Sequence, residues 1–432
     1  MTADSEVHPA SIWAVSALLA GVFLNAALLR YEGMHYPNAA HPWQLLLTTI
    51  VYSLFLCFGV CYFPLRLGNR SEGSFDNIIQ SVFGTTPAWV FKRVVIPVWA
   101  ATWFAFLTTL GTSALGWSLT HPFPVDPPGW PPHPLLVHGI WFLMIGPIAD
   151  ASLPRLANSS VFVVKVSFAA ILGLLLSSAR FAPATIARIQ GLDEMPGLTF
   201  ESHVLIWAIP PLFVCANLIR PYVAARRTAR IILIVGIALP LLFVLLSAIY
   251  TMAGAAAIDG RWAKVPEYAE YAGARFHKIG WVKLLVLTFT LLTAARLAVN
   301  AAVRSLTNRK SLVVGAIVTA LLMGASFWTQ NSVWAQLAWQ YAAVPFAPLA
   351  GVLCGNYAAF GAAMPTLSSR DRAVTILSWI SGCLVTCGPA FMGESHHSMA
   401  VHSAWVLLGW MSSFTAACTY LSMKKISGHC ES

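Results

Sequence analysis

Long apolar stretches separated by short polar segments run along the chain from residue 11 to residue 422. A helix that crosses a bilayer needs about 20 mostly apolar residues. Twelve stretches meet that length and are predicted spans, near residues 11–30, 43–65, 88–118, 133–151, 159–181, 202–224, 229–257, 279–303, 311–328, 333–361, 372–393 and 399–422. The pattern predicts an all-α integral membrane protein with twelve transmembrane helices, in which residues 1–432 form one transmembrane domain.

The composition supports this assignment and excludes the main soluble classes. Only 10% of the residues are charged, 58% are hydrophobic, and the mean hydropathy is +0.70. Soluble domains carry about 25% charged residues. These figures exclude a soluble enzyme, a nucleic-acid-binding protein and a disordered scaffold. The net charge of +10 is therefore a question of which side of the membrane the cations occupy.

Lys and Arg are shared unevenly between the two sides. With an even number of spans, both termini lie on one side, whose connections hold fifteen of the 26 cations against seven on the other side. The remaining four lie within or near the spans. Because loops rich in Lys and Arg stay in the cytoplasm, we expect a multi-pass protein of the cell membrane with both termini cytoplasmic. The fifteen are Arg66, Arg70, Lys92, Arg93, Arg155, Arg226, Arg227, Arg230, Arg304, Arg309, Lys310, Arg370, Arg372, Lys424 and Lys425.

The first and sixth predicted spans carry signals of an interrupted helix. Pro210 and Pro211 lie near the middle of span 202–224, where two backbone donors are missing. Gly21 and Asn25 lie at mid-depth of the first span. Broken helices in corresponding spans build the substrate sites of many transporters. The pattern favours a secondary transporter over a channel or an enzyme, with a simple proline kink in the sixth span as the alternative.

Four short motifs follow one another in order over most of the chain. They are Phe83-Gly84 with Arg93 and Trp103-Phe104, then Asn217 with Leu239-Pro240, then Ala294 to Asn300, and finally the run from Pro348 to Tyr357 that reads PLAGVLCGNY. Together they resemble the nucleobase:cation symporter family, the permeases of cytosine, purines, allantoin and hydantoins. That family lies in the amino acid-polyamine-organocation superfamily.

The resemblance implies a fold and a function. The fold would be two inverted five-helix repeats, 11–181 and 202–361, with broken helices 1 and 6, followed by two peripheral helices within 372–422. The function would be secondary active transport of a nucleobase-like planar heterocycle by alternating access. The partners would be a small-molecule substrate and membrane lipid, and no nucleic acid.

Several positions depart from the family pattern. Ala294 and Ala295 stand where sodium-coupled members carry a Ser-Thr pair, and methyl groups cannot ligate a hard cation. Arg220 and Asn356 stand where members carry Asp. The sequence therefore predicts a transporter that is not coupled through the usual sodium site. Proton coupling or facilitated exchange is favoured instead.

A planar heterocycle needs an aromatic face and a few polar groups at its edge. Trp103 resembles the family's stacking residue, and the Asn300 amide can both donate and accept. Further candidates for substrate binding are Gly21 and Asn25 in the first span and Asn217 in the sixth span. Ordinary packing is the alternative for Trp103, and an interhelical hydrogen bond is the alternative for Asn300.

Arg296 lies roughly 12 Å deeper than Arg304, at about 1.5 Å per residue. A charge at such depth is costly and usually has a partner. Three interpretations stay open. The side chain could replace the sodium ion as a tethered cation, bind an anionic substrate, or bind backbone carbonyls of an opened helix.

The remaining observations leave two other functions open. The cysteine pairs Cys57/Cys61 and Cys383/Cys387 fit small buried residues of packed helices better than a metal site, and we expect no cofactor, no metal and no catalytic group.

An amino-acid or organic-anion carrier on the same fold is one alternative function. A transport-incompetent sensor or partner subunit is the other. The oligomeric state is not predicted.

Overall fold

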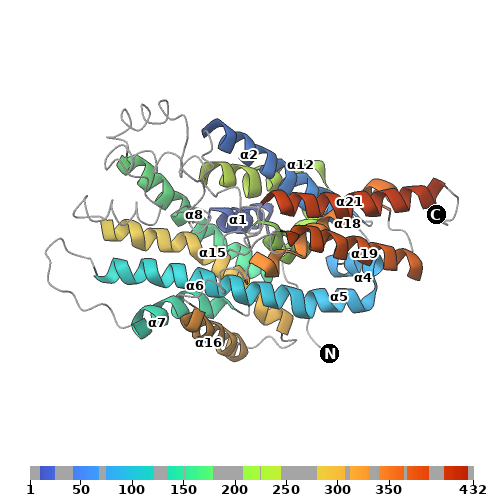
Figure 1. Cartoon of the computed structure of the whole chain (residues 1–432). Helices are drawn as coiled ribbons and strands as arrows, with labels where there is room; N and C mark the ends of the chain where they lie inside the picture. The colour runs from blue at the N-terminus through green and yellow to red at the C-terminus, as the bar shows by residue number, and fades with distance from the viewer. Residues whose placement is uncertain are drawn as a thin grey trace.

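The computed structural model describes most of the chain (Figure 1). The described residues are 10–24, 42–67, 74–120, 134–149, 151–178, 208–223, 225–244, 280–306, 312–329, 338, 340–363, 367–388 and 403–426. Within these ranges every regular element is a helix, which confirms the predicted all-α fold.

The helices follow the predicted spans closely. In the first half they are α1 (Ile12–Phe23), α2 (Pro42–Phe55), η2 (Leu56–Tyr62), α3 (Phe63–Arg66), α4 (Phe75–Phe83), α5 (Thr85–Val90), η3 (Phe91–Val95), α6 (Ile96–Thr120), α7 (Pro134–Ile145), η4 (Gly146–Ile148) and α8 (Leu153–Ser178). In the second half they are α11 (Ala216–Val223), α12 (Arg226–Ile231), η6 (Ile232–Ala238), α15 (Gly280–Leu306), α16 (Leu312–Thr329), α18 (Phe346–Phe360), α19 (Ser369–Thr386) and α21 (Ser403–Ile426). Three of them, η2, η3 and η6, are π-helical, and η4 is a 3-10 turn.

Four described helical stretches are long and apolar enough to cross a membrane, over residues 85–112, 226–244, 340–360 and 404–426. Shorter apolar helices cover residues 12–23, 50–66, 135–148 and 313–324. The chain is therefore a multi-pass membrane protein. The total of twelve spans, the division into repeats and the cytoplasmic position of the termini remain predictions.

α1 lies at the centre of the molecule (Figure 1). It packs against α8, α15 and η6, and its Leu18, Leu19 and Phe23 side chains are fully buried. Such all-round burial is typical of a helix that faces protein rather than lipid. α6 and α15 pack side by side along their length, and the start of α15 lies beside the end of α6, so the two are antiparallel (Figure 1).

The last three helices form a bundle in which glycines allow close approach. α18 carries Gly351 and Gly355 four residues apart, and both face α21. A methyl group at Gly351 would lie 2.3 Å from the carbonyl oxygen of Trp410. On α19, a methyl group at Gly382 would lie 2.6 Å from the carbonyl oxygen of Gly409. Small residues at this spacing let membrane helices pack backbone to backbone, so α18, α19 and α21 form a tight unit.

A carboxylate joins two helices of the same bundle. Asp371 and Ser368 form a capping box at the start of α19, and Lys424 near the end of α21 donates to Asp371 at 2.5 Å. Tyr420 donates to the other carboxylate oxygen at 3.1 Å. Burial alone would raise the pKa of Asp371, but the hydrogen bonds from Lys424, Ser368 and Tyr420 outweigh it and lower the pKa to about 2. The carboxylate therefore stays ionised and holds the α19 and α21 ends together.

We expect Gly351→Ala to destabilise the protein, because the added methyl forces α18 and α21 apart. Overpacking of this kind costs about 1–3 kcal/mol. Gly139→Ala on α7 is the matched control, since no atom lies within 4 Å of the added methyl there. Thermal unfolding of the purified variants checks this. A Gly351→Ala melting temperature equal to that of Gly139→Ala would contradict the close packing.

Candidate functional site

Five aromatic side chains form a cluster between α6, α18, the helical stretch 208–214 and η3. We call Phe91, Trp99, Trp103, Phe213 and Phe346 the central aromatic cluster. Trp99 and Trp103 stack with ring centroids 6.0 Å apart. Phe346 meets Trp99 edge-on at 5.8 Å, Phe91 at 5.2 Å and Phe213 at 5.9 Å. The cluster joins rings from the predicted third, sixth and tenth spans.

The residue spacing explains why α6 presents two indoles to the same neighbours. Trp99 and Trp103 are four residues apart and therefore lie on one face of the helix. Both are fully buried, at 0% and 1% exposure. Trp103 thus packs within the aromatic cluster, and its role as a stacking platform stays a prediction. Trp99 was not predicted, although its i, i+4 spacing from Trp103 is a readable signal.

Two buried side-chain atoms on the adjacent helices α6 and α15, Nε1 of Trp99 and Oδ1 of Asn300, are among those that have no hydrogen-bond partner among the described residues. Leaving such a group unpaired costs about 1–3 kcal/mol. Arg93 Nη1 donates to the Ser305 carbonyl at 2.5 Å, which places residue 93 of the third predicted span level with residue 305. Because α6 and α15 are antiparallel, Trp99 and Asn300 lie at nearly the same depth.

The amide nitrogen of Asn300 is already engaged. Its Nδ2 donates to the carbonyl oxygens of Ala149 at 3.0 Å and Ala151 at 2.7 Å. Both carbonyls belong to the connection between η4 and α8. Asn300 therefore anchors α15 to that connection with its donor half and leaves its acceptor half free for another partner.

Arg296 makes a similar contact one helical turn earlier. Its Nε and Nη2 donate to the Met144 carbonyl at 3.1 and 2.7 Å. That carbonyl lies at the end of α7, and Pro147, three residues later, has no N–H with which to pair it. Of the three interpretations of Arg296, these bonds match the one with backbone carbonyls. The tethered-cation and anion-binding interpretations remain predictions.

Gly21 lies where α1 meets α15 and α8. A methyl group there would lie 2.7 Å from Thr293 Oγ1 and 2.7 Å from the Val164 side chain. Glycine is therefore needed for close helix packing at this point. Ala294 and Ala295 are buried, at 1% and 0% exposure. Asn25 lies outside the described residues.

The sixth predicted span departs from helix at Cys215. Pro210 and Pro211 lie within the helical stretch 208–214, residue 215 is a turn, and α11 begins at Ala216. The Cys215 N–H still bonds to the Pro211 carbonyl at 2.9 Å. In the described part of this span, the departure thus follows the prolines by one turn. Phe213, two residues after Pro211, belongs to the central aromatic cluster.

Asn217 lies away from the central aromatic cluster. Its Oδ1 accepts from the backbone N–H of Phe75 at 2.5 Å, and the residue itself is exposed. The side chain therefore caps α4. The structure brings Trp103 and Asn300 to neighbouring helices, places Gly21 and Arg296 in helix contacts, and puts Asn217 at the end of a different helix.

No protein-family model matches the chain, and no curated protein matches it. Among solved structures the chain is similar to MHP1, a nucleobase-cation-symport-1 family transporter in a closed conformation with bromovinylhydantoin bound. The identity is 15%, the match covers 98% of this chain and 93% of that chain, and the TM-score is 0.64.

Two further structures have similar folds. One is a substrate-bound, outward-open Na+-coupled sialic acid symporter, at 11% identity, covering 95% of this chain and 89% of that chain, with a TM-score of 0.58. The other is MhsT in complex with L-phenylalanine, at 13% identity, covering 97% of this chain and 98% of that chain, with a TM-score of 0.56. The chain thus has the fold of these membrane transporters over nearly its whole length.

We expect Arg296→Met to lower the melting temperature, because the Met144 carbonyl loses its donors at a cost of about 1–3 kcal/mol. Arg296→Lys retains an ammonium group that can donate to this carbonyl, so its melting temperature should lie between those of Arg296→Met and the native protein. In a Pro147→Ala background the drop in melting temperature should be smaller, because residue 147 regains an N–H that can donate to the freed Met144 carbonyl. Equal melting temperatures for Arg296→Met and the native protein, without ligand, would instead favour a substrate contact.

Proposed function

We propose that this protein is a secondary transporter that moves a nucleobase-like planar heterocycle across the cell membrane by alternating access. The observation that carries the proposal is the central aromatic cluster, which includes Trp103, together with Trp99 Nε1 and Asn300 Oδ1, which have no hydrogen-bond partner within the described part of the chain. The fold similarity to a hydantoin-bound transporter over 98% of the chain supports it.

The residue chemistry suits a flat ring with an amide edge. The Trp103 indole offers a stacking face of the kind that aromatic ligands prefer. Trp99 Nε1 is a donor and Asn300 Oδ1 is an acceptor. A ring that carries a carbonyl beside an N–H, as nucleobases and hydantoins do, offers an acceptor for the first and a donor for the second. Binding such a ring would remove the cost of the two unpaired polar atoms.

Three residues of the eighth predicted span bear on ion coupling. Ala294 and Ala295 offer methyl groups where a hydroxyl pair would be needed for sodium. Arg296 adds a permanent positive charge one residue further along. We therefore propose that transport is not driven through the usual sodium site, and that proton coupling or facilitated exchange replaces it.

An aromatic amino acid is the second candidate substrate. The rings of Trp99, Phe213 and Phe346 suit a phenyl group as well as a heterocycle, and MhsT binds L-phenylalanine on a similar fold. A carboxylate would need a cationic partner to offset its charge, and the Arg296 guanidinium is engaged with the Met144 carbonyl. The heterocycle is therefore favoured over the amino acid, and over an organic anion for the same reason.

A ligand panel tests the substrate class. Uracil, cytosine, hypoxanthine, a 5-substituted hydantoin, L-phenylalanine and sialic acid are compared by thermal shift on purified protein, with sodium and with choline as the counter-ion. We expect stabilisation by a heterocycle, loss of that stabilisation in Trp103→Ala, and equal shifts in the two salts. Stabilisation that requires sodium would contradict the interpretation of Ala294 and Ala295. Ligand binding without uptake into vesicles would indicate a sensor or partner subunit.

Trp99 provides a sharper test of edge recognition. Trp99→Phe keeps an aromatic ring and removes only the N–H donor, so affinity for the heterocycle should fall roughly tenfold, the value of one hydrogen bond of about 1.4 kcal/mol. Trp141→Phe is the matched control, because Trp141 Nε1 donates to Thr108 at 3.2 Å, outside the cluster. Calorimetric titration measures both. Equal losses in the two variants would rule out Trp99 as a ligand donor.

A further inference from the structure

α4 is a short amphipathic helix between the second and third predicted spans, and other helices hold it at both ends. Its Phe75, Ile78 and Val82 side chains are buried, whereas Asn77 and Gln80 are exposed. Its C-terminal end contacts α19: Arg372 Nε donates to the Ser81 carbonyl at 3.3 Å, and the Phe83 and Trp379 rings meet at 5.8 Å. Its N-terminal end contacts the sixth predicted span.

The N-terminal cap of α4 comes from a residue far away in the sequence. Ser74 occupies the N-cap position, but its side chain makes no capping hydrogen bond. The Phe75 N–H is one of the donors that a helix cannot satisfy internally. Asn217 Oδ1, 142 residues away, accepts that hydrogen bond at 2.5 Å. Asn217 is the second residue of α11 and follows the turn at Cys215 by two positions.

A ring contact adds to the cap on the other side of the same turn. The Phe75 ring lies 5.6 Å from the Phe213 ring, and Phe213 belongs to the central aromatic cluster. α4 therefore contacts the sixth span both before and after its departure from helix. A movement of α11 about Cys215 would break the Asn217 cap, and a movement of the 208–214 stretch would break the ring contact.

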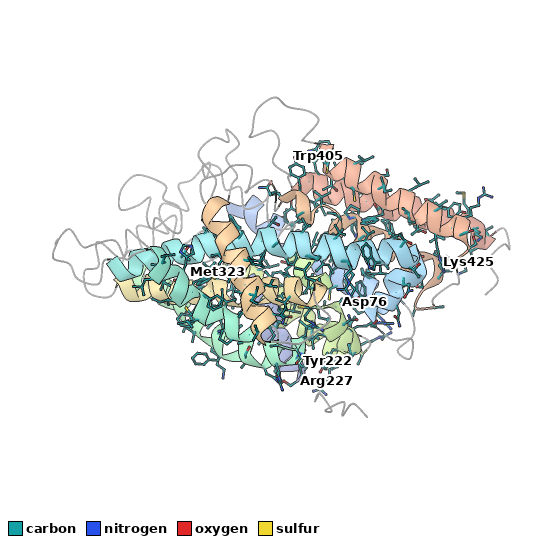
Figure 2. All side chains as sticks on the ribbon, turned by 90° about the horizontal axis from the view of Figure 1, so that it is seen from below. Asp76, Tyr222, Arg227, Met323, Trp405 and Lys425 are labelled. Carbon is teal, nitrogen blue, oxygen red and sulfur yellow. The ribbon has the colours of Figure 1, made fainter. Side chains whose placement is uncertain are left out.

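The two attachments of α4 differ in rigidity. α19 belongs to the bundle with α18 and α21, which glycine packing and the Asp371–Lys424 pair hold together. α11 lies outside that bundle: it follows the turn at Cys215, and its Arg220 donates to the Leu67 carbonyl at the end of α3. Figure 2 places Asp76 of α4 and Lys425 of α21 toward the same end of the molecule, and both lie on the side predicted to be cytoplasmic.

We propose that α4 is the latch of the inner gate: in this conformation it joins α11 to the α18–α19–α21 bundle, and release of the Asn217 cap and the Phe75–Phe213 contact opens the central aromatic cluster to the cytoplasmic side. The proposal rests on alternating access, the function proposed above. One capping bond and one ring pair are weak enough to break and re-form during a transport cycle.

Cys215 is a native reporter for this movement, because it lies at the turn and is 0% exposed. In a variant that retains Cys215 and has the other seven cysteines replaced by Ala, the rate of modification by a membrane-impermeant maleimide is measured in inside-out and right-side-out vesicles, without substrate. Asn217→Ala should speed modification roughly fivefold, the effect of losing one helix cap. The increase should occur in inside-out vesicles only.

Two variants serve as controls. Asn217→Asp keeps an oxygen acceptor for the Phe75 N–H and should restore a rate near that of the parent. Ser81→Ala removes a hydroxyl that bonds within α4, to the Ile78 carbonyl at 2.8 Å, and leaves the cap intact, so it should not change the rate. If Asn217→Ala does not fold, Arg372→Gln releases the other end of α4 and should raise the rate in the same vesicles.

An unchanged rate in Asn217→Ala overturns the proposal. An equal increase in both vesicle orientations also overturns it, because that indicates local unfolding rather than a gate. The assay contains no ligand, so a wrong substrate class would not change its result. If the modification rate depends on the Asn217 cap but no heterocycle binds, the latch is supported and the proposed substrate is rejected.

Discussion

The interaction on which this fold depends is the hydrogen bond from a cationic side chain to the carbonyl end of a helix. Inside a membrane every backbone polar group needs a partner within the protein, and the last carbonyls of a helix have none within the helix itself. They also carry partial negative charge, which favours a cation nearby. Five such contacts occur among the described residues: Arg93 to Ser305, Arg220 to Leu67, Arg296 to Met144, Arg372 to Ser81 and Lys425 to Ala359.

In each of these five contacts the cation finds a partially negative partner at a helix end, so a carboxylate is not required there, in a chain that has 26 cations and 16 acids. Two other cations in the described part of the chain, Lys92 and Lys424, pair with carboxylates. Most of the contacts also join helices that are distant in sequence. Arg93 attaches η3 to the end of α15, and Arg296 attaches α15 to the end of α7. The helices next to the central aromatic cluster are thereby held in place from their ends.

Much of the fold was predictable from the sequence, and much of the site was not. The length and spacing of apolar stretches determine which segments are helices, because lipid excludes other local structures. The partner of Arg296, by contrast, is a backbone carbonyl, and every residue has one, so no sequence pattern identifies it. Asn217 was predicted to contact substrate because it is a polar residue in the sixth span. Its hydrogen-bond partner, the Phe75 N–H, is 142 residues away, and no local pattern points to it. The π-helical segments, such as η2 and η6, also carry no recognisable signal.

The same charge arrangement bears on what the central region can bind. Arg296 is permanently charged and half-buried, and its hydrogen-bond partner among the described residues is a neutral carbonyl rather than a carboxylate. A carbonyl satisfies its hydrogen-bonding groups but leaves its full charge in place. In a region of low dielectric that charge repels a sodium ion or a cationic substrate over several ångströms. It does not repel a neutral heterocycle. The charge of Arg296 therefore disfavours sodium and cationic substrates nearby and leaves a neutral ligand largely unaffected.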